Sequence, residues 1–115
     1  MEDQDRDAGR LELIIQLIDA LDRRLSQIPS EKFVADGDEI DLTSYRLSVI
    51  GEECDKLSQT IKGRHDLPWQ AIYGLRNVVA HNYLAIDPER IWIAATENLA
   101  ALHRACIIEL AKFDI

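Results

Sequence analysis

The stretch AGRLELIIQLIDALDRRLSQI, residues 8–28, carries an apolar residue at every third or fourth position. An α-helix repeats about every 3.6 residues, so these positions fall on one side of a helix and give it an apolar face. Pro29 follows directly and cannot continue the helix, because it lacks a backbone N–H. The pattern predicts a long helix over residues 8–28 whose inward face is formed by Leu11, Ile14, Ile15, Ile18, Leu21, Leu25 and Ile28.

A second helix with the same periodicity is predicted from a cap at Asp41 or Thr43 to about Lys62. Residues 36–38, Asp-Gly-Asp, have the composition of a turn that precedes it. Gly51 lies inside this helix and leaves room for another helix to approach closely. The inward positions of the second helix are Leu47, Ile50, Cys54, Leu57 and Ile61.

Two further helix starts carry a proline in the first turn, where its missing N–H costs nothing. Residues 66–68 open a third helix that extends to about Leu84, and residues 87–89 open a last helix that extends to about Lys112. Ser30–Phe33 fits one short helical turn. No segment alternates apolar and polar residues as a strand would. The sequence therefore predicts an all-α protein, an antiparallel bundle of four long helices plus a short extra helical turn.

The size and composition of the chain fit one soluble domain. At 115 residues it can bury a modest core, and we expect a flexible acidic N-terminus over residues 1–7 and a single helical domain over residues 8–115. The start lacks the apolar segment of a secretory signal, and no apolar run is long enough to span a membrane. Cys54 and Cys106 are far apart and fit small buried residues in a reducing cytoplasm.

The net charge of −8 argues against tight, non-specific binding to RNA, because phosphate contacts supply most of the affinity of nucleic-acid binders. Four basic or titratable residues lie close together before the third helix: Lys56, Lys62, Arg64 and His65. They fit either a local basic lining for RNA or an ordinary solvated helix end. The acidic surface also suits a basic protein partner, since complementary charge speeds encounter.

The third helix carries the residues with the clearest chemistry. Arg76, His81 and Tyr83 form the pattern R-x4-H-x-Y, which combines a fixed cation, a group that titrates near neutral pH and a phenol. On a continuous α-helix Arg76 and Tyr83 would lie almost in line, and Asn77 and His81 would share the adjacent line. Histidine can move a proton at a ribose hydroxyl, arginine can bind the phosphate, and Asn77 can orient either group. These residues predict cleavage of a phosphodiester.

A charged arginine on a half-apolar helix face needs an anionic partner. The sequence offers an internal carboxylate, such as Glu52 or Glu53, or an external anion for Arg76. A purely structural role, with Arg76 in an internal ion pair, is the alternative. No cofactor and no metal ion are expected, because the histidines lack ligand spacing with acidic residues; they are His65, His81 and His103.

The surrounding sequence resembles the HEPN superfamily and specifically the HepT-like toxins of prokaryotic toxin–antitoxin pairs. The resemblance covers roughly residues 8–112. The wider superfamily is marked by the Arg76 and His81 pair, whereas Tyr83 and the flanking tryptophan pairs point to the HepT branch. The matching segments are Ile50–Glu52, Leu67–Asn77, His81–Tyr83, Ile86–Asp87 and Ile91–Trp92.

The resemblance implies a metal-independent endoribonuclease that acts as the toxin of a type II/VII-like toxin–antitoxin pair in the cytoplasm. It implies a homodimer whose two motif helices face one another, with Arg76 and His81 as catalytic residues. Products would carry a 2′,3′-cyclic phosphate, or a 3′-phosphate, and a 5′-hydroxyl. The matching tyrosine in HepT-like toxins accepts AMP from a cognate minimal nucleotidyltransferase (MNT) antitoxin, so Tyr83 is the expected site of AMPylation. No membrane partner is expected.

Two other functions stay open at this point. The chain could be a non-catalytic nucleotide- or substrate-binding partner of a nucleotidyltransferase, which the acidic charge favours, or a structural bundle that only dimerises. Trp69 and Trp92 either stack on bases or anchor helix packing, and His103 fits a seam or surface position.

Overall fold

The computed structural model describes residues 2–77 and 87–113. Within these ranges the regular elements are all helical, which confirms the predicted all-α class. In chain order they are α1 (Glu2–Leu25), α2 (Ser30–Phe33), α3 (Gly37–Lys56), α4 (Gln59–Arg64), α5 (Trp69–Gly74), the 3-10 helix η1 (Leu75–Asn77), α6 (Pro88–Thr96) and α7 (Ala100–Leu110).

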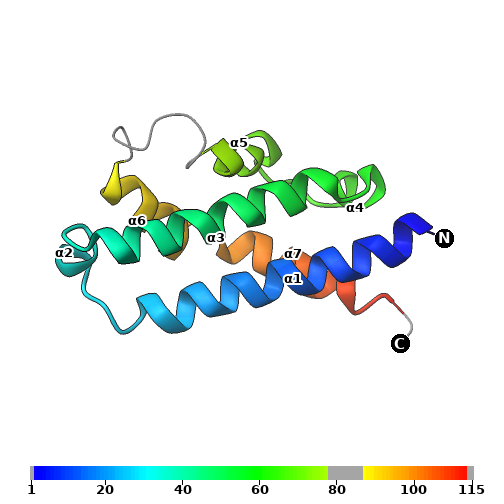
Figure 1. Cartoon of the computed structure of the whole chain (residues 1–115). Helices are drawn as coiled ribbons and strands as arrows, with labels where there is room; N and C mark the ends of the chain where they lie inside the picture. The colour runs from blue at the N-terminus through cyan, green and yellow to red at the C-terminus, as the bar shows by residue number, and fades with distance from the viewer. Residues whose placement is uncertain (1, 78–86, 114–115) are drawn as a thin grey trace.

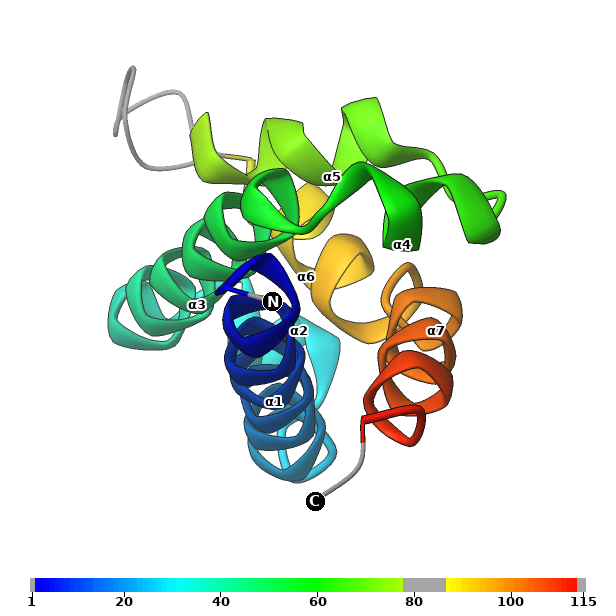
Figure 2. The same ribbon diagram turned by 90° about the vertical axis from the view of Figure 1, so that its right-hand side faces the viewer.

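The two longest helices, α1 and α3, run antiparallel and form the centre of the molecule (Figure 1). Helix α7 packs along α1, and α6 packs against α1, α2 and α3. Helices α5 and η1 lie on the side of α3 away from α1, as the end-on view also shows (Figure 2). The core between these layers contains the buried residues of the predicted stripes together with Phe33, which is fully buried.

Helix α1 differs from its prediction at both ends. It begins at Glu2 rather than Ala8 and ends at Leu25 rather than Ile28. Near its start the Asp7 side chain is buried and accepts a hydrogen bond of 3.0 Å from the Ser58 backbone N–H. This bond ties the first turns of α1 to the start of α4. The flexibility of residues 1–7 as a whole stays a prediction.

The predicted cap of the second helix is wrong. Helix α3 begins at Gly37, because the Asp36 carboxylate accepts hydrogen bonds from the N–H groups of Asp38 and Glu39. The Asp-Gly-Asp stretch that reads as a turn is therefore the helix start. Thr43, one of the two expected caps, is buried inside the helix, and the other, Asp41, also lies within it.

Besides the third predicted helix, where α5 ends at Gly74, two other predicted long helices are interrupted. The second breaks at Leu57 and Ser58, where the backbone is extended and the Ser58 hydroxyl accepts the Ile61 N–H to begin α4. The bond from Asp7 fixes this break from outside the segment. The last predicted helix is divided into α6 and α7 at residues 97–99, where neither proline nor glycine marks the interruption. The buried stripes continue across both breaks.

Both cysteines are free and buried in the core, as predicted. Burial raises the pKa of the Cys106 thiol to about 12 and also raises the pKa of the Cys54 thiol. Both side chains therefore act as small apolar groups.

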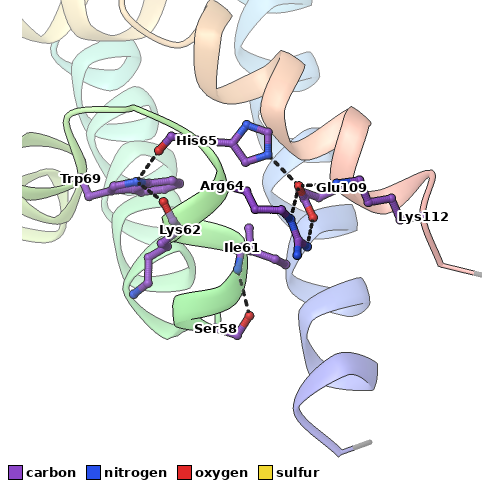
Figure 3. Close-up of polar contacts among 8 residues, drawn as sticks. All are labelled: Ser58, Ile61, Lys62, Arg64, His65, Trp69, Glu109 and Lys112. Atoms are coloured by element: carbon purple, nitrogen blue, oxygen red, sulfur yellow. Dashed lines mark hydrogen bonds and ion pairs between the residues drawn. The ribbon is translucent and has the colours of Figure 1, made fainter.

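A buried carboxylate joins α4 to α7 (Figure 3). Glu109 is 1% exposed and accepts hydrogen bonds from the Arg64 guanidinium at 2.5 and 3.1 Å and from the Lys112 ammonium at 3.1 Å. The ring Nε2 of His65 lies 2.7 Å from the same carboxylate. The hydrogen bond from Arg64 is the main cause, opposed by burial, that lowers the pKa of Glu109 to about 2.

The close contact between α3 and the α5–η1 segment depends on Gly51. A Cβ atom at this position would lie 2.7 Å from the Arg76 backbone nitrogen and 2.9 Å from the Ile72 carbonyl oxygen. Both distances are shorter than real Cβ contacts, and both partners are backbone atoms that cannot rotate away. The predicted close approach at Gly51 is therefore confirmed, and the neighbour is the segment that carries Arg76.

Gly51→Ala should destabilise the protein. Alanine favours a helix over glycine by about 1 kcal/mol, but overpacking against backbone costs roughly 1–3 kcal/mol, so we expect a net loss of up to about 2 kcal/mol. Urea unfolding would measure it. Gly9→Ala is the matched control, because a Cβ at Gly9 meets nothing within 4 Å. Equal stabilisation by both substitutions would contradict the close contact.

Glu109→Gln should weaken the fold in a pH-dependent way. Because the folded pKa of about 2 lies below the ordinary value of 4.5, the carboxylate stabilises the fold fully above pH 4.5 and loses that contribution as the pH falls toward 2. We expect a loss of about 1–3 kcal/mol at pH 7 that shrinks markedly at pH 3. Guanidinium unfolding at both pH values would measure it, with the exposed Glu12→Gln as control. A difference that does not change with pH would contradict the assignment.

Candidate active site

Arg76 lies in η1, directly after α5, where its backbone N–H packs against Gly51 of α3. Its guanidinium Nη1 donates a hydrogen bond of 2.7 Å to Asp55 Oδ2, and the two side chains are 42% and 39% exposed. An ion pair at this exposure is worth at most about 1 kcal/mol. Arg76 is thus positioned on a rigid backbone but stays accessible to a ligand from solvent.

The partner of Arg76 differs from the two carboxylates that the sequence suggested. Glu52 and Glu53 instead approach Lys56 at 3.6 and 3.9 Å, and Glu53 also lies 3.9 Å from Arg10. The reason is helical geometry, because a residue four positions after Gly51 returns to the same face of α3 and residues one or two positions later do not. That residue is Asp55, which sequence reasoning missed, although its spacing from Gly51 could have indicated it.

Asn77 is exposed and ends η1. The expected single α-helix through the motif is wrong in its first part, because α5 ends at Gly74 and Leu75–Asn77 form a tighter 3-10 turn. His81 and Tyr83 lie outside the described residues. The expected alignment of these two residues with Asn77 and Arg76 therefore stays a prediction.

Aromatic and basic side chains hold α5 against α4. The Trp69 indole N–H donates to the backbone oxygens of Lys62 and His65, each at 3.1 Å (Figure 3). Lys62 is buried, donates from Nζ to the Asp55 carbonyl oxygen at 3.0 Å, and lies 5.0 Å from the centre of the Tyr73 ring. Trp69 therefore anchors packing. Trp92, on α6, also anchors packing, and its ring centre lies 5.1 Å from that of the buried Phe33.

The basic cluster before the motif fits the solvated helix end only in part, because its exposed members are Lys56 and Arg64. Lys62 is buried, and Arg64 and His65 contact Glu109. Lys56 is half exposed beside two glutamates of its own helix. The structure therefore uses this cluster mainly to join α4 to its neighbours rather than as a basic surface for RNA.

His103 lies at the seam between α7 and α1, as predicted. Its Nε2 atom is 2.9 Å from Asp19 Oδ1, and its side chain is 27% exposed. Among residues 2–77 and 87–113 no group of three or more His, Cys, Asp or Glu side chains could hold a metal ion. Over the same part of the chain, no helix combines the length and the apolar character required to cross a membrane.

Comparisons with known proteins point to a ribonuclease family. A family model described as Ribonuclease HepT-like matches residues 14–107. A curated protein of Caldanaerobacter subterraneus subsp. tengcongensis, named "Putative RNase TTE0752", is 28% identical over 95 residues, which are 82% of this chain and 85% of that protein. No solved structure matches the chain significantly.

The matched region includes α3 with Gly51 and Asp55, the α5–η1 segment with Arg76, and the whole R-x4-H-x-Y pattern. Membership of a ribonuclease family supports cleavage of RNA, and it confirms the resemblance found in the sequence. The chain belongs to the Ribonuclease HepT-like family.

Proposed function

We propose that this chain is the toxin of a type II/VII-like toxin–antitoxin pair and acts as a metal-independent endoribonuclease. The observation that carries the proposal is Arg76, a partly exposed guanidinium whose backbone is fixed on α3 within the R-x4-H-x-Y pattern of a HepT-like ribonuclease. A rigid, solvent-accessible arginine can bind a phosphate without a large ordering cost.

The proposed reaction uses the 2′-hydroxyl of the RNA as its nucleophile. His81 removes the proton from this hydroxyl, and the oxygen attacks the adjacent phosphorus. Arg76 stabilises the negative charge on the pentacovalent phosphorus, and Asn77 orients His81 or a phosphate oxygen. The bond to the 5′-oxygen breaks, and this oxygen takes up a proton from a protonated His81 of the proposed dimer. The products are a 2′,3′-cyclic phosphate and a 5′-hydroxyl.

The active form is proposed to be a two-fold dimer. Acid–base catalysis of this kind benefits from two titrating groups, whereas one chain supplies a single histidine in the pattern. Two chains related by a two-fold axis would place two copies of Arg76 and His81 around one cleft. The second arginine at the cleft also adds positive charge locally, which helps a protein with a net negative charge to bind an anionic substrate.

Tyr83 is the proposed site of inhibition. A cognate MNT antitoxin would transfer AMP to its hydroxyl, with release of pyrophosphate from ATP. The added phosphate would introduce negative charge and bulk beside the catalytic residues and would compete with RNA for Arg76.

A second candidate function is a non-catalytic partner of a nucleotidyltransferase that binds a nucleotide or its substrate. Arg64 and His65 contact Glu109, and this observation favours the second candidate. Less positive charge then remains for binding a long RNA than the sequence suggested. A single nucleotide needs fewer phosphate contacts than RNA does.

Arg76→Ala and His81→Ala should each abolish growth arrest on induced expression and reduce RNA cleavage in the presence of EDTA by at least about a hundredfold. Cleavage would be measured on total RNA, with the 5′ and 3′ ends of the fragments identified chemically. Arg24→Ala is the matched control, since it removes an arginine from a surface ion pair with Glu39. Fragments with a 5′-phosphate, or full activity of Arg76→Ala, would contradict the proposed mechanism.

Tyr83→Phe should escape AMPylation and stay toxic when the antitoxin is present. The purified protein would be incubated with the antitoxin and ATP, and the modified peptide would be identified by mass spectrometry. Tyr45→Phe is the control, because Tyr45 is 63% exposed on α3 and should not affect modification. Attachment of AMP to Tyr83→Phe elsewhere in the motif would show that the assignment is wrong.

A further inference from the structure

We propose that Asp55 is a positioning residue for the reaction, because it holds the Arg76 guanidinium in the orientation that binds the scissile phosphate. The inference rests on the proposed ribonuclease function and extends it to a residue outside the R-x4-H-x-Y pattern. Its starting point is the 2.7 Å hydrogen bond between Arg76 Nη1 and Asp55 Oδ2.

The position of Asp55 is unfavourable for a carboxylate unless a cation is nearby. It is the second-last residue of α3, where the helix dipole is negative, and Glu52 lies one turn earlier on the same helix. Each effect costs a few tenths of a kcal/mol for a partly exposed group. Arg76 supplies the compensating positive charge. The pairing, rather than the stability of α3, explains a carboxylate at this point.

Asp55 is itself held in place from a second direction. Its carbonyl oxygen accepts the hydrogen bond from the buried Lys62 ammonium, and Lys62 packs over the Tyr73 ring. On the other side, Gly51 brings the Arg76 backbone against α3 four residues before Asp55. Both ends of the ion pair are therefore attached to packed backbone, and the ion pair restricts the rotation of the two side chains between them.

The ion pair leaves Arg76 able to bind a phosphate at the same time. Asp55 engages Nη1, and a guanidinium carries further N–H donors in a planar fork that suits phosphate oxygens. With one edge of the plane fixed on Asp55, the opposite edge keeps a constant direction. Orientation of this kind acts mainly in the transition state, when charge develops on the phosphate.

The opposite role is that Asp55 competes with the substrate for Arg76. The two roles make different kinetic predictions. Loss of a positioning residue lowers kcat. Loss of a competitor leaves kcat unchanged or higher and lowers KM, because the guanidinium no longer has to leave its internal partner.

The test is steady-state cleavage of a short RNA by Asp55→Asn, Asp55→Glu and Arg76→Ala in the full-length chain. Asp55→Asn should lower kcat roughly tenfold, because small errors in orientation at a reacting centre are costly. Its KM should be unchanged or lower, because one negative charge near the RNA is removed. Asp55→Glu should recover part of kcat. Asp55→Asn combined with Arg76→Ala should be no worse than Arg76→Ala alone.

Glu39→Gln is the matched control. It removes one negative charge from the same helix and breaks an arginine ion pair with a hydrogen bond of 2.6 Å, but at the opposite end of α3. Its kcat should equal that of wild type. Thermal unfolding of all variants would show whether a loss of kcat follows from a loss of fold.

The outcomes separate this inference from the function on which it rests. Asp55→Asn with wild-type kcat, while Arg76→Ala is inactive, would overturn the positioning role alone. A raised kcat in Asp55→Asn would also overturn it and would identify a competitor. Wild-type activity in Arg76→Ala, or no activity in the wild type, would overturn the proposed function itself.

Discussion

The contact between Gly51 and the backbone of the α5–η1 segment is the constraint on which the site depends. It lets α3 and the arginine-bearing turn approach more closely than any larger residue would permit. Because backbone meets backbone, the position of Arg76 is set by main-chain geometry and not by the rotamer of a flexible side chain. The ion pair with Asp55 is weak, but it acts on a group whose attachment point is already fixed.

Polar contacts of unequal strength complete this support. Glu109 is nearly inaccessible to solvent and binds cations from α4 and its own helix end, so it connects the segment before the motif to α7. Trp69 and Lys62 then connect α4 to α5 and to the end of α3. A buried charge is costly unless it is paired, so these contacts favour one particular packing of the segments. Arg64 and Lys112 are therefore already paired with a carboxylate, which reduces what they contribute to an RNA-binding surface.

The sequence was sufficient for the helical class and for most of the core. Predicted inward positions such as Leu11, Leu47 and Ile61 recur at helical spacing, and burial follows this spacing even where the helix is interrupted. The breaks were not predictable in the same way. Ser58 begins a new helix partly because Asp7, far away in the chain, accepts its backbone N–H.

In the site, as in the fold, the sequence indicated what depends on nearby residues and not what depends on residues far away in the chain. The motif residues Arg76 and Asn77 could be identified because their spacing to His81 is local. The ion-pair partner was missed among the acidic residues of α3, because its four-residue spacing from Gly51 gains meaning only once Gly51 is known to contact the Arg76 backbone. The cap at Asp36 was misjudged because Asp-Gly-Asp fits a turn and a helix start equally well.

The burial of the two thiols has a consequence for how the protein reacts with oxidants. Cys54 and Cys106 are the only cysteines of the chain, and desolvation keeps both protonated at neutral pH. Peroxides and disulfides react with thiolates that they can reach, so the folded chain offers them no reactive sulfur from cysteine. Oxidants can therefore modify these residues only in molecules that have already unfolded.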